Sequence, residues 1–211
     1  MNNIDTGQIR IDYRVILDWV PEDSSVLELG CGFGDLLFYL AKLRKARVKG
    51  IEIDSQAIFT CVSRGLSISH QDIDEGLSEY ADRTFDYVIL NQCLQEVRKP
   101  HVALSEAVRV GKKAIVGFPN FAHYGARIQL ALQGRAPVTP ALPYQWYDTP
   151  NLHFLSIRDF MVYCRINKLS IEKSAFIRGK GLSRFWPNLL ADSGLFLISA
   201  SEKNYAAVSR D

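Results

Sequence analysis

The stretch Val26-Leu-Glu-Leu-Gly-Cys-Gly-Phe-Gly-Asp35 decides the fold of this chain of 211 residues. Its first four residues are typical of a short buried strand, and glycines follow at alternate positions, Gly30, Gly32 and Gly34. Glycines allow a tight turn from strand to helix and let a ligand approach the bare backbone. The start of the next helix offers unpaired N–H groups to an anionic group. One glycine would be explained by a turn alone, whereas three in this spacing favour ligand binding.

Strands and helices alternate along the rest of the chain. Hydrophobic runs predict further strands at 48–54, 66–70, 85–90 and 114–118, and a last antiparallel pair at 170–177 and 195–199. The pattern predicts intervening helices, and Ser156 with Asp159 forms a capping-box start for one whose inner face is Ile157, Phe160, Met161 and Cys164. This alternation predicts an α/β fold with a Rossmann-like, doubly wound, mainly parallel sheet. Ligands of such sheets bind outside the carboxyl ends of the strands, at the switch point.

The segment 135–155 interrupts the alternation. It contains four prolines and several aromatic residues, among them Tyr144, Trp146 and Tyr147. Prolines reduce the entropy lost on ordering, and Tyr and Trp are enriched in interface hot spots. The segment is therefore predicted to be an ordered insertion, either a lid over the ligand site or a surface for a partner. The two interpretations are compatible.

Composition limits the classes of partner. The formal net charge is only +2, which gives no case for nucleic acid or an anionic membrane surface. No apolar run approaches the ~20 residues of a membrane span, and residues 1–7 do not resemble a secretory signal. The four cysteines are too widely spaced for a zinc or redox motif, so we expect free thiols and no metal. We expect one cytoplasmic domain over residues 1–211.

The glycine spacing discriminates between nucleotide-type ligands. A dinucleotide fingerprint beginning at Gly30 would need a third glycine where Asp35 stands, and an aspartate there would repel a pyrophosphate. The P-loop pattern is absent. The pattern Glu-x-Gly-x-Gly-x-Gly over 28–34 instead resembles the first motif of class I S-adenosylmethionine-dependent methyltransferases.

That resemblance implies a seven-stranded sheet and a site for S-adenosylmethionine, or for its demethylated product S-adenosylhomocysteine. Backbone N–H groups of the loop, which includes Cys31, would meet the ligand's carboxylate, and Glu28 its ammonium. Glu52, followed by Ile53, stands near the spacing expected for a carboxylate on the ribose hydroxyls. Asp54 is a nearby alternative, which we assign instead to capping the next helix.

Two further positions follow from the same resemblance. Asp72 and Ile73, after the third strand, resemble the pair that meets the adenine amine and ring. Asn91, followed by Gln92, stands after the fourth strand, where the superfamily lines the methyl-transfer pocket.

The sequence does not identify catalytic residues. The segment Asn91-Gln-Cys-Leu94 lacks the Asn/Asp-Pro-Pro-Tyr/Phe motif of many N-methylating enzymes. His123, His153 and Glu96 are available as general bases, although methyl transfer by proximity alone needs none. Phe33 is a bulky residue in the loop, and we expect it to crowd the mouth of the site.

Nearly the whole chain also resembles one family within that superfamily, the MetW family of methionine-biosynthesis proteins. The most specific mark is Ala141-Leu-Pro-Tyr-Gln-Trp-Tyr-Asp-Thr-Pro-Asn151, supported by Phe118-Pro-Asn-Phe121 and Asp72-Ile-Asp-Glu-Gly76. The resemblance implies an accessory or regulatory partner of a MetX-type homoserine O-acyltransferase, with Tyr144, Trp146 and Tyr147 as candidate contacts. The alternative is a methyltransferase acting on a small molecule.

Overall fold

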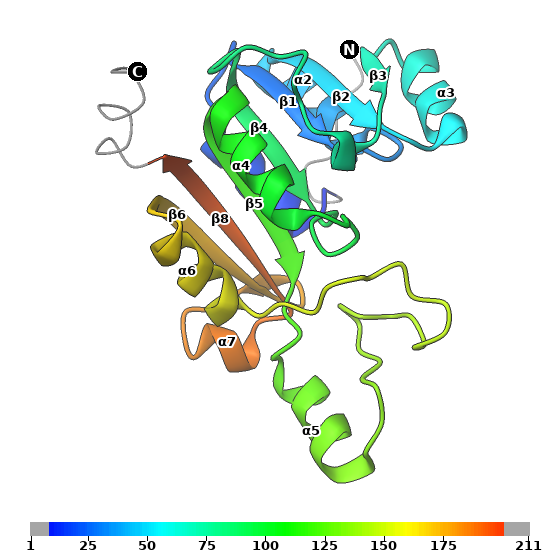
Figure 1. Ribbon diagram of the computed structural model, residues 1–211, viewed down its shortest axis with the longest axis vertical. Coiled ribbons are helices and arrows are strands. Elements are labelled where there is room, and N and C mark those ends of the chain that lie inside the picture. Colours follow the sequence, from blue (N-terminus) through cyan, green and yellow to red (C-terminus); the bar gives the residue numbers. More distant parts are fainter. Residues whose placement is uncertain (1–8, 201–211) are drawn as a thin grey trace.

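A single twisted sheet organises the structure, a computed structural model that describes residues 9–200. The ends of the expected domain, 1–8 and 201–211, lie outside the described residues. Within them, eight strands follow the order β3-β2-β1-β4-β5-β8-β6-β7 (Figure 1). The strands are β1 Ser25–Leu29, β2 Arg47–Glu52, β3 Ile68–His70, β4 Phe85–Asn91, β5 Gly111–Pro119, β6 Leu169–Arg178, β7 Gly181–Leu182 and β8 Ser193–Ala200.

The strand pairing confirms the predicted mainly parallel, doubly wound architecture. β1 lies parallel to both β2 and β4, β2 to β3, and β4 to β5. β8 lies antiparallel to both β5 and β6, which is the predicted closing pair. The chain leaves β1 toward β2 on one side and returns to β4 on the other. The switch point therefore lies at the carboxyl end of β1, where the glycine loop begins.

The sheet has eight strands among the described residues instead of the expected seven, because it contains one additional short strand, β7. The strand predicted at 170–177 continues to Arg178 and turns back on itself, so that Ile177 pairs with Leu182 and Arg178 with Gly181. Gly179 has a φ of +55° in the connecting turn, a conformation that glycine adopts without strain. The additional strand β7 contains two residues, too few to show as hydrophobic alternation.

Helices cover both faces of the sheet. Alternate residues of β1 point to opposite faces: Leu27 joins the core beneath α4 and α6, whereas Val26 joins the core that α1 and α2 cover. Figure 1 shows α4 and α6 together on the near face. The helices are α1 Ile11–Trp19, α2 Asp35–Arg44, α3 Ser55–Ser63, α4 Pro100–Val110, α5 Tyr124–Gln133, α6 Ile157–Ile166 and α7 Pro187–Leu190, with a 3₁₀ turn, η2, at Ile73–Glu75.

The helix α6 begins as predicted but buries a narrower face. Its capping box forms, because Ser156 Oγ accepts from the Asp159 N–H and Asp159 Oδ2 accepts from the Ser156 N–H. Ile157, Phe160 and Cys164 are buried, whereas Met161 is 48% exposed, so its placement on the inner face was wrong. Met161 follows Phe160 by ~100° around the helix, which carries it past the edge of the contact with the sheet.

The predicted insertion extends away from the sheet. Figure 1 shows α5 and the chain after it projecting beyond the carboxyl ends of β4 and β5. We call residues 134–155 the arm. Its aromatic residues Trp146 and Tyr147 are 75% and 70% exposed, and Tyr144 is 48% exposed. The arm therefore presents large aromatic surfaces to the surroundings.

Candidate functional site

The glycine loop adopts a backbone conformation that favours glycine at three positions. Gly30, Gly32 and Gly34 have φ angles of +66°, +52° and +75° between the end of β1 and the start of α2. The Gly30 and Cys31 N–H groups donate to the Ile51 carbonyl at 2.9 and 3.2 Å. These bonds fix the loop against the end of the neighbouring strand β2.

The three glycines differ in what surrounds them. A Cβ at Gly34 would approach Leu66 Cδ1 to 2.6 Å and Cys61 Sγ to 2.7 Å, and one at Gly30 would approach Cys93 Cβ to 3.0 Å. A Cβ at Gly32 would meet no atom within 4 Å. Gly30 and Gly34 are therefore required by packing as well as by φ, whereas Gly32 borders open space.

That space is a cavity of ≈ 340 Å³ at the carboxyl ends of β1, β2 and β4. Six of the ten residues predicted to bind a cofactor line it: Gly30, Gly32, Glu52, Ile53, Asp72 and Ile73. A volume of this size lies at the lower end of the range for small-molecule sites. The switch-point prediction therefore located a real cavity.

Four predicted site residues do not line the cavity. Glu28, Cys31 and Asn91 are buried beneath or beside the loop, and Gly34 forms the N-terminus of α2. Phe33 is 59% exposed and does not line the cavity either, so the expectation that it crowds the mouth was wrong.

Glu28 is an unusual buried carboxylate. The residue is 4% exposed, and its Oε2 has no hydrogen-bond partner among the described residues. Burial, and next the negative charge of Asp12, raise the pKa of Glu28 well above its ordinary value. Such an orphaned acceptor is costly unless a donor arrives. The ammonium of an amino-acid-like ligand at the loop is a donor of the required kind.

Asn91 is held by a partner that no local pattern indicates. Its Nδ2 donates to Asp12 Oδ2 at 2.9 Å, and Asp12 also pairs with Arg10 at 2.6 Å. Asp12 is 4% exposed, at the start of α1. Asn91 thus links the end of β4 to the N-terminal helix beside Glu28. It does not project into the glycine-loop cavity.

Glu52 is oriented by backbone donors. Its Oε2 accepts from the Gly32 N–H at 2.7 Å, and its Oε1 accepts from the N–H groups of Ile53 and Asp54 at 2.8 and 3.0 Å. A carboxylate has about four acceptor sites, so one remains for a ribose hydroxyl. Asp54 caps α3, because its Oδ1 accepts from the Ala57 N–H at 2.7 Å. This contact confirms the capping role that the sequence predicted for Asp54.

Asp72 is fixed from two directions. Its Oδ1 accepts from the Asp74 N–H at 2.9 Å, and its Oδ2 pairs with Arg98 at 2.8 Å. Arg98 also pairs with Asp74 at 3.1 Å. Ile73 opens the short turn η2 beside them. The carboxylate and the apolar side chain are thus adjacent on the cavity wall, as an adenine site requires.

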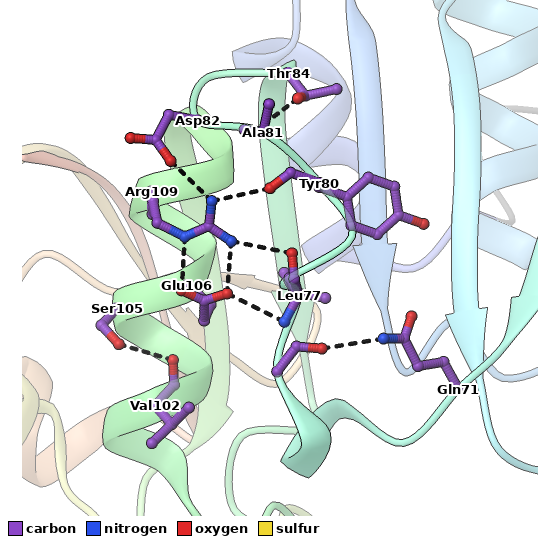
Figure 2. A network of polar contacts seen from close by, with 11 residues as sticks. Gln71, Leu77, Tyr80, Ala81, Asp82, Thr84, Val102, Ser105, Glu106 and Arg109 are labelled. Carbon is purple, nitrogen blue, oxygen red and sulfur yellow. Dashed lines mark hydrogen bonds and ion pairs between the residues drawn. The ribbon is translucent and has the colours of Figure 1, made fainter.

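An arginine anchors the chain that continues from this wall to β4. Arg109 on α4 donates to the Leu77 and Tyr80 carbonyls at 3.0 and 2.9 Å, and it also bonds to Asp82 and Glu106 (Figure 2). In Figure 2 these partners surround the guanidinium from the helix and from the loop. Arg109 therefore anchors residues 77–82, the segment that follows the wall formed by Asp72 and Ile73.

Sequence reasoning missed part of the cavity wall. Cys93 lines it and has a pKa raised mainly by burial, and Gln71 and Val97 line it as well. Gln71 directly precedes Asp72, whereas Cys93 and Val97 lie in the loop after β4, and no spacing rule marks any of the three. Glu96, considered only as a base, also lines the cavity, whereas His123 and His153 do not.

A second cavity of ≈ 520 Å³ adjoins the first. Gln92 and Glu96 line both cavities, and Pro140, Tyr144 and Asn151 of the arm also line the second one. The Leu152 and His153 N–H groups donate to the Gln95 carbonyl at 2.9 and 3.0 Å. The arm is therefore attached to the same loop that borders both cavities.

Residues 9–200 contain neither a metal site nor a membrane span. No cluster of His, Cys, Asp or Glu there has the arrangement of a metal site. No helix in that range is long and apolar enough to cross a membrane. The four cysteines are buried free thiols, as their spacing predicted.

Several solved structures with the same fold are described as methyltransferases. A protein from Thermotoga maritima, described as a SAM-dependent methyltransferase and possible histamine N-methyltransferase, superposes with a TM-score of 0.65 at 17% identity, covering 90% of this chain and 87% of that one. A SAM-dependent methyltransferase from Archaeoglobus fulgidus gives 0.67 at 13% identity, covering 89% and 90%. At these identities the likeness shows the fold.

Sequence comparison identifies the family. A Rhodopirellula baltica protein named bifunctional methionine biosynthesis protein MetXA/MetW is 36% identical over 160 residues, which are 72% of this chain and 26% of that protein. The chain thus spans about a quarter of that relative's length. A ribosomal protein L11 methyltransferase from Janthinobacterium is 33% identical over 49% of this chain and 36% of that protein. Residues 10–198 match the family described as methionine biosynthesis protein MetW, and the chain belongs to this MetW family.

Proposed function

We propose that this protein binds S-adenosylmethionine in the glycine-loop cavity and acts in methionine biosynthesis as an accessory partner of a MetX-type homoserine O-acyltransferase. The observation that carries the proposal is the attachment of the exposed aromatic arm to Gln95, beside the cavity. A ligand-binding site and a candidate partner surface thus share one loop.

The cavity suits the cofactor on several points. Glu52 retains an acceptor site for a ribose hydroxyl, and Asp72 with Ile73 forms a wall suited to adenine. The backbone of Gly30 and Gly32 borders the cavity and lets the ligand's amino-acid end approach closely. S-adenosylmethionine bound here would supply an activated methyl group. The chain's own residues bind and orient it.

A relative's composition supports the partner. The Rhodopirellula baltica protein carries the names MetXA and MetW in one chain, which suggests that the two activities work together. In the protein described here the arm offers Trp146 and Tyr147, ring centroids 5.6 Å apart, with most of their surface exposed. Exposed paired aromatic residues are the usual anchors of a protein interface. The arm is therefore the proposed contact.

The experiment measures binding of the purified protein to a MetX-type acyltransferase with and without saturating S-adenosylmethionine. Replacing Trp146 and Tyr147 with alanine should weaken the complex at least tenfold while leaving the fold intact. Phe59→Ala is the matched control, because Phe59 is 76% exposed on α3, away from the arm. Ligand-dependent affinity, typically worth about 1–3 kcal/mol, would support coupling between the two sites. Equal affinity with and without the ligand would refute it.

A methyltransferase acting on a small molecule is the second candidate. The observation in its favour is the second cavity, which adjoins the first at Gln92 and Glu96 and has room for an acceptor. Formation of S-adenosylhomocysteine on addition of a small-molecule cell extract, abolished by Glu52→Ala, would support this activity. Absence of turnover by protein that binds the cofactor would leave the accessory role.

A further inference from the structure

The wall of the glycine-loop cavity is strongly negative. Glu52, Asp72, Asp74 and Glu96 all line it, and no lysine, arginine or histidine among the described residues does. An excess of carboxylates facing one cavity is unfavourable unless each is compensated. A cavity carboxylate that has no fixed partner in the protein therefore indicates where a positively charged group of a ligand would be favoured.

Three of the four carboxylates are compensated by the protein itself. Glu52 accepts from three backbone N–H groups. Asp72 and Asp74 share Arg98, and Asp74 also accepts from the backbone N–H groups of Arg98 and Lys99. These negative charges have fixed partners before any ligand arrives.

Glu96 is different. Among the described residues, the only hydrogen bond to its carboxylate comes from Gln95 Nε2, at the long distance of 3.5 Å. Glu96 is exposed at the edge of the cavity, yet the loss of water around part of its carboxyl, and further the charge of Glu52, raise its pKa. Glu52 and Glu96 thus act on each other across the cavity with no cation between them. Glu96 also borders the second cavity, so it stands at the junction of the two.

The shape of the proposed ligand brings one group to this junction. The amino-acid end would lie at Gly30 and Gly32, the ribose at Glu52 and the adenine at Asp72 and Ile73. The sulfur joins the amino-acid end to the ribose, so it lies between the loop and Glu52. Gln92, Cys93 and Glu96, on the loop after β4, also line the cavity, and a Cβ at Gly30 would approach Cys93 Cβ to 3.0 Å.

We propose that Glu96 is the counter-charge for the sulfonium, so that the site selects the positively charged S-adenosylmethionine over the neutral S-adenosylhomocysteine. This inference rests on the proposed cofactor site. The two ligands differ by one methyl group and one positive charge at sulfur. Without a charged neighbour a protein distinguishes them weakly, whereas a carboxylate a few ångströms away favours the cation. The site therefore favours the methyl donor over its demethylated product.

The test is calorimetric titration of the wild type, Glu96→Gln and Glu79→Gln with three ligands: S-adenosylmethionine, S-adenosylhomocysteine and sinefungin, whose amine replaces the sulfonium methyl group. Glu79 is exposed and does not line the cavity, so its variant controls for loss of one negative charge. The wild type and Glu79→Gln should bind both cationic ligands about tenfold more tightly than S-adenosylhomocysteine, equivalent to about 1.4 kcal/mol.

In Glu96→Gln this preference should disappear through loss of affinity for the cations, with affinity for S-adenosylhomocysteine unchanged. Unchanged binding of the neutral ligand also shows that the variant is folded. Glu96→Asp, which keeps the charge, should retain the preference. Equal wild-type affinity for the charged and neutral ligands would overturn the inference without any variant. So would an equal loss of affinity for all three ligands in Glu96→Gln. Wild type that binds none of them would overturn the proposed cofactor site as well.

Discussion

Replacing Gly34 and Gly32 separately with alanine would distinguish a glycine required for packing from one required for binding. Both residues have positive φ, +75° and +52°, so alanine pays a similar backbone cost of about 1–2 kcal/mol at each. At Gly34 the new methyl group also meets Leu66 Cδ1 at 2.6 Å and Cys61 Sγ at 2.7 Å. Both neighbours are buried in one apolar cluster, which restricts their movement. Such overpacking costs a further ~1–3 kcal/mol.

The expected result is therefore a difference between the variants. Gly34→Ala should lower the free energy of unfolding by about 2–5 kcal/mol, and Gly32→Ala by only about 1–2 kcal/mol. Gly32 lines the cavity, and a methyl group there would meet no protein atom within 4 Å. Gly32→Ala should thus weaken S-adenosylmethionine binding although it remains the more stable variant.

Urea denaturation followed by circular dichroism measures the stability, and calorimetric titration measures the affinity. A change in the midpoint with an unchanged slope would attribute the effect to the native state. Equal destabilisation by the two substitutions would refute the packing argument at Gly34. Unaltered affinity in Gly32→Ala would refute the placement of the ligand against the loop.

Three further variants test individual contacts. Glu28→Gln should raise the free energy of unfolding at neutral pH by about 1 kcal/mol, because Glu28 ionises near its ordinary pKa in the unfolded chain while burial raises its pKa in the folded protein. In urea titrations this gain should vanish below pH 4.5, the ordinary pKa of the carboxyl. A gain that persists there would contradict the assignment. Asp86→Asn should cost about 1–2 kcal/mol at pH 7, because the Lys112 bond and the Ser25 N–H lower the pKa of Asp86 from 3.8 to about 2. Its effect should be lost as pH falls from 3.8 to about 2, and a cost independent of pH would indicate another cause. Arg109→Ala should lower the free energy of unfolding by about 2 kcal/mol. It should also weaken S-adenosylmethionine binding, because the segment that follows the cavity wall loses its anchor. If Arg109→Lys has wild-type affinity and stability, the positive charge alone is sufficient.

Much of the scaffold was predictable because it depends on neighbours in sequence. The glycine loop, the alternation of strands and helices and the Asp54 cap all arise from residues within a few positions of one another. Local steric preferences and hydrophobic periodicity decide such features. The same reasoning missed β7, whose two residues are too few to form a pattern. It also placed Met161 inside, because periodicity does not reveal how wide a face the neighbouring sheet covers.

The electrostatics of the site were not predictable from local pattern. The bond between Asn91 and Asp12 joins residues 79 apart, and it removes Asn91 from the cavity where its position after β4 had placed it. Arg98, which lies in the loop after β4, forms ion pairs with Asp72 and Asp74. These contacts exist only because the sheet brings distant segments to the same edge.

The sequence by itself determined the position of the glycine loop, the class of sheet and the family, because these depend on residue types in fixed spacing. Only the tertiary structure decided that Glu28 lacks a donor, that the arm is attached to Gln95, and that Glu96 is the cavity carboxylate without a strong partner. A carboxylate's partners are set by distances in space, and those distances arise only when strands that are far apart in the chain end side by side.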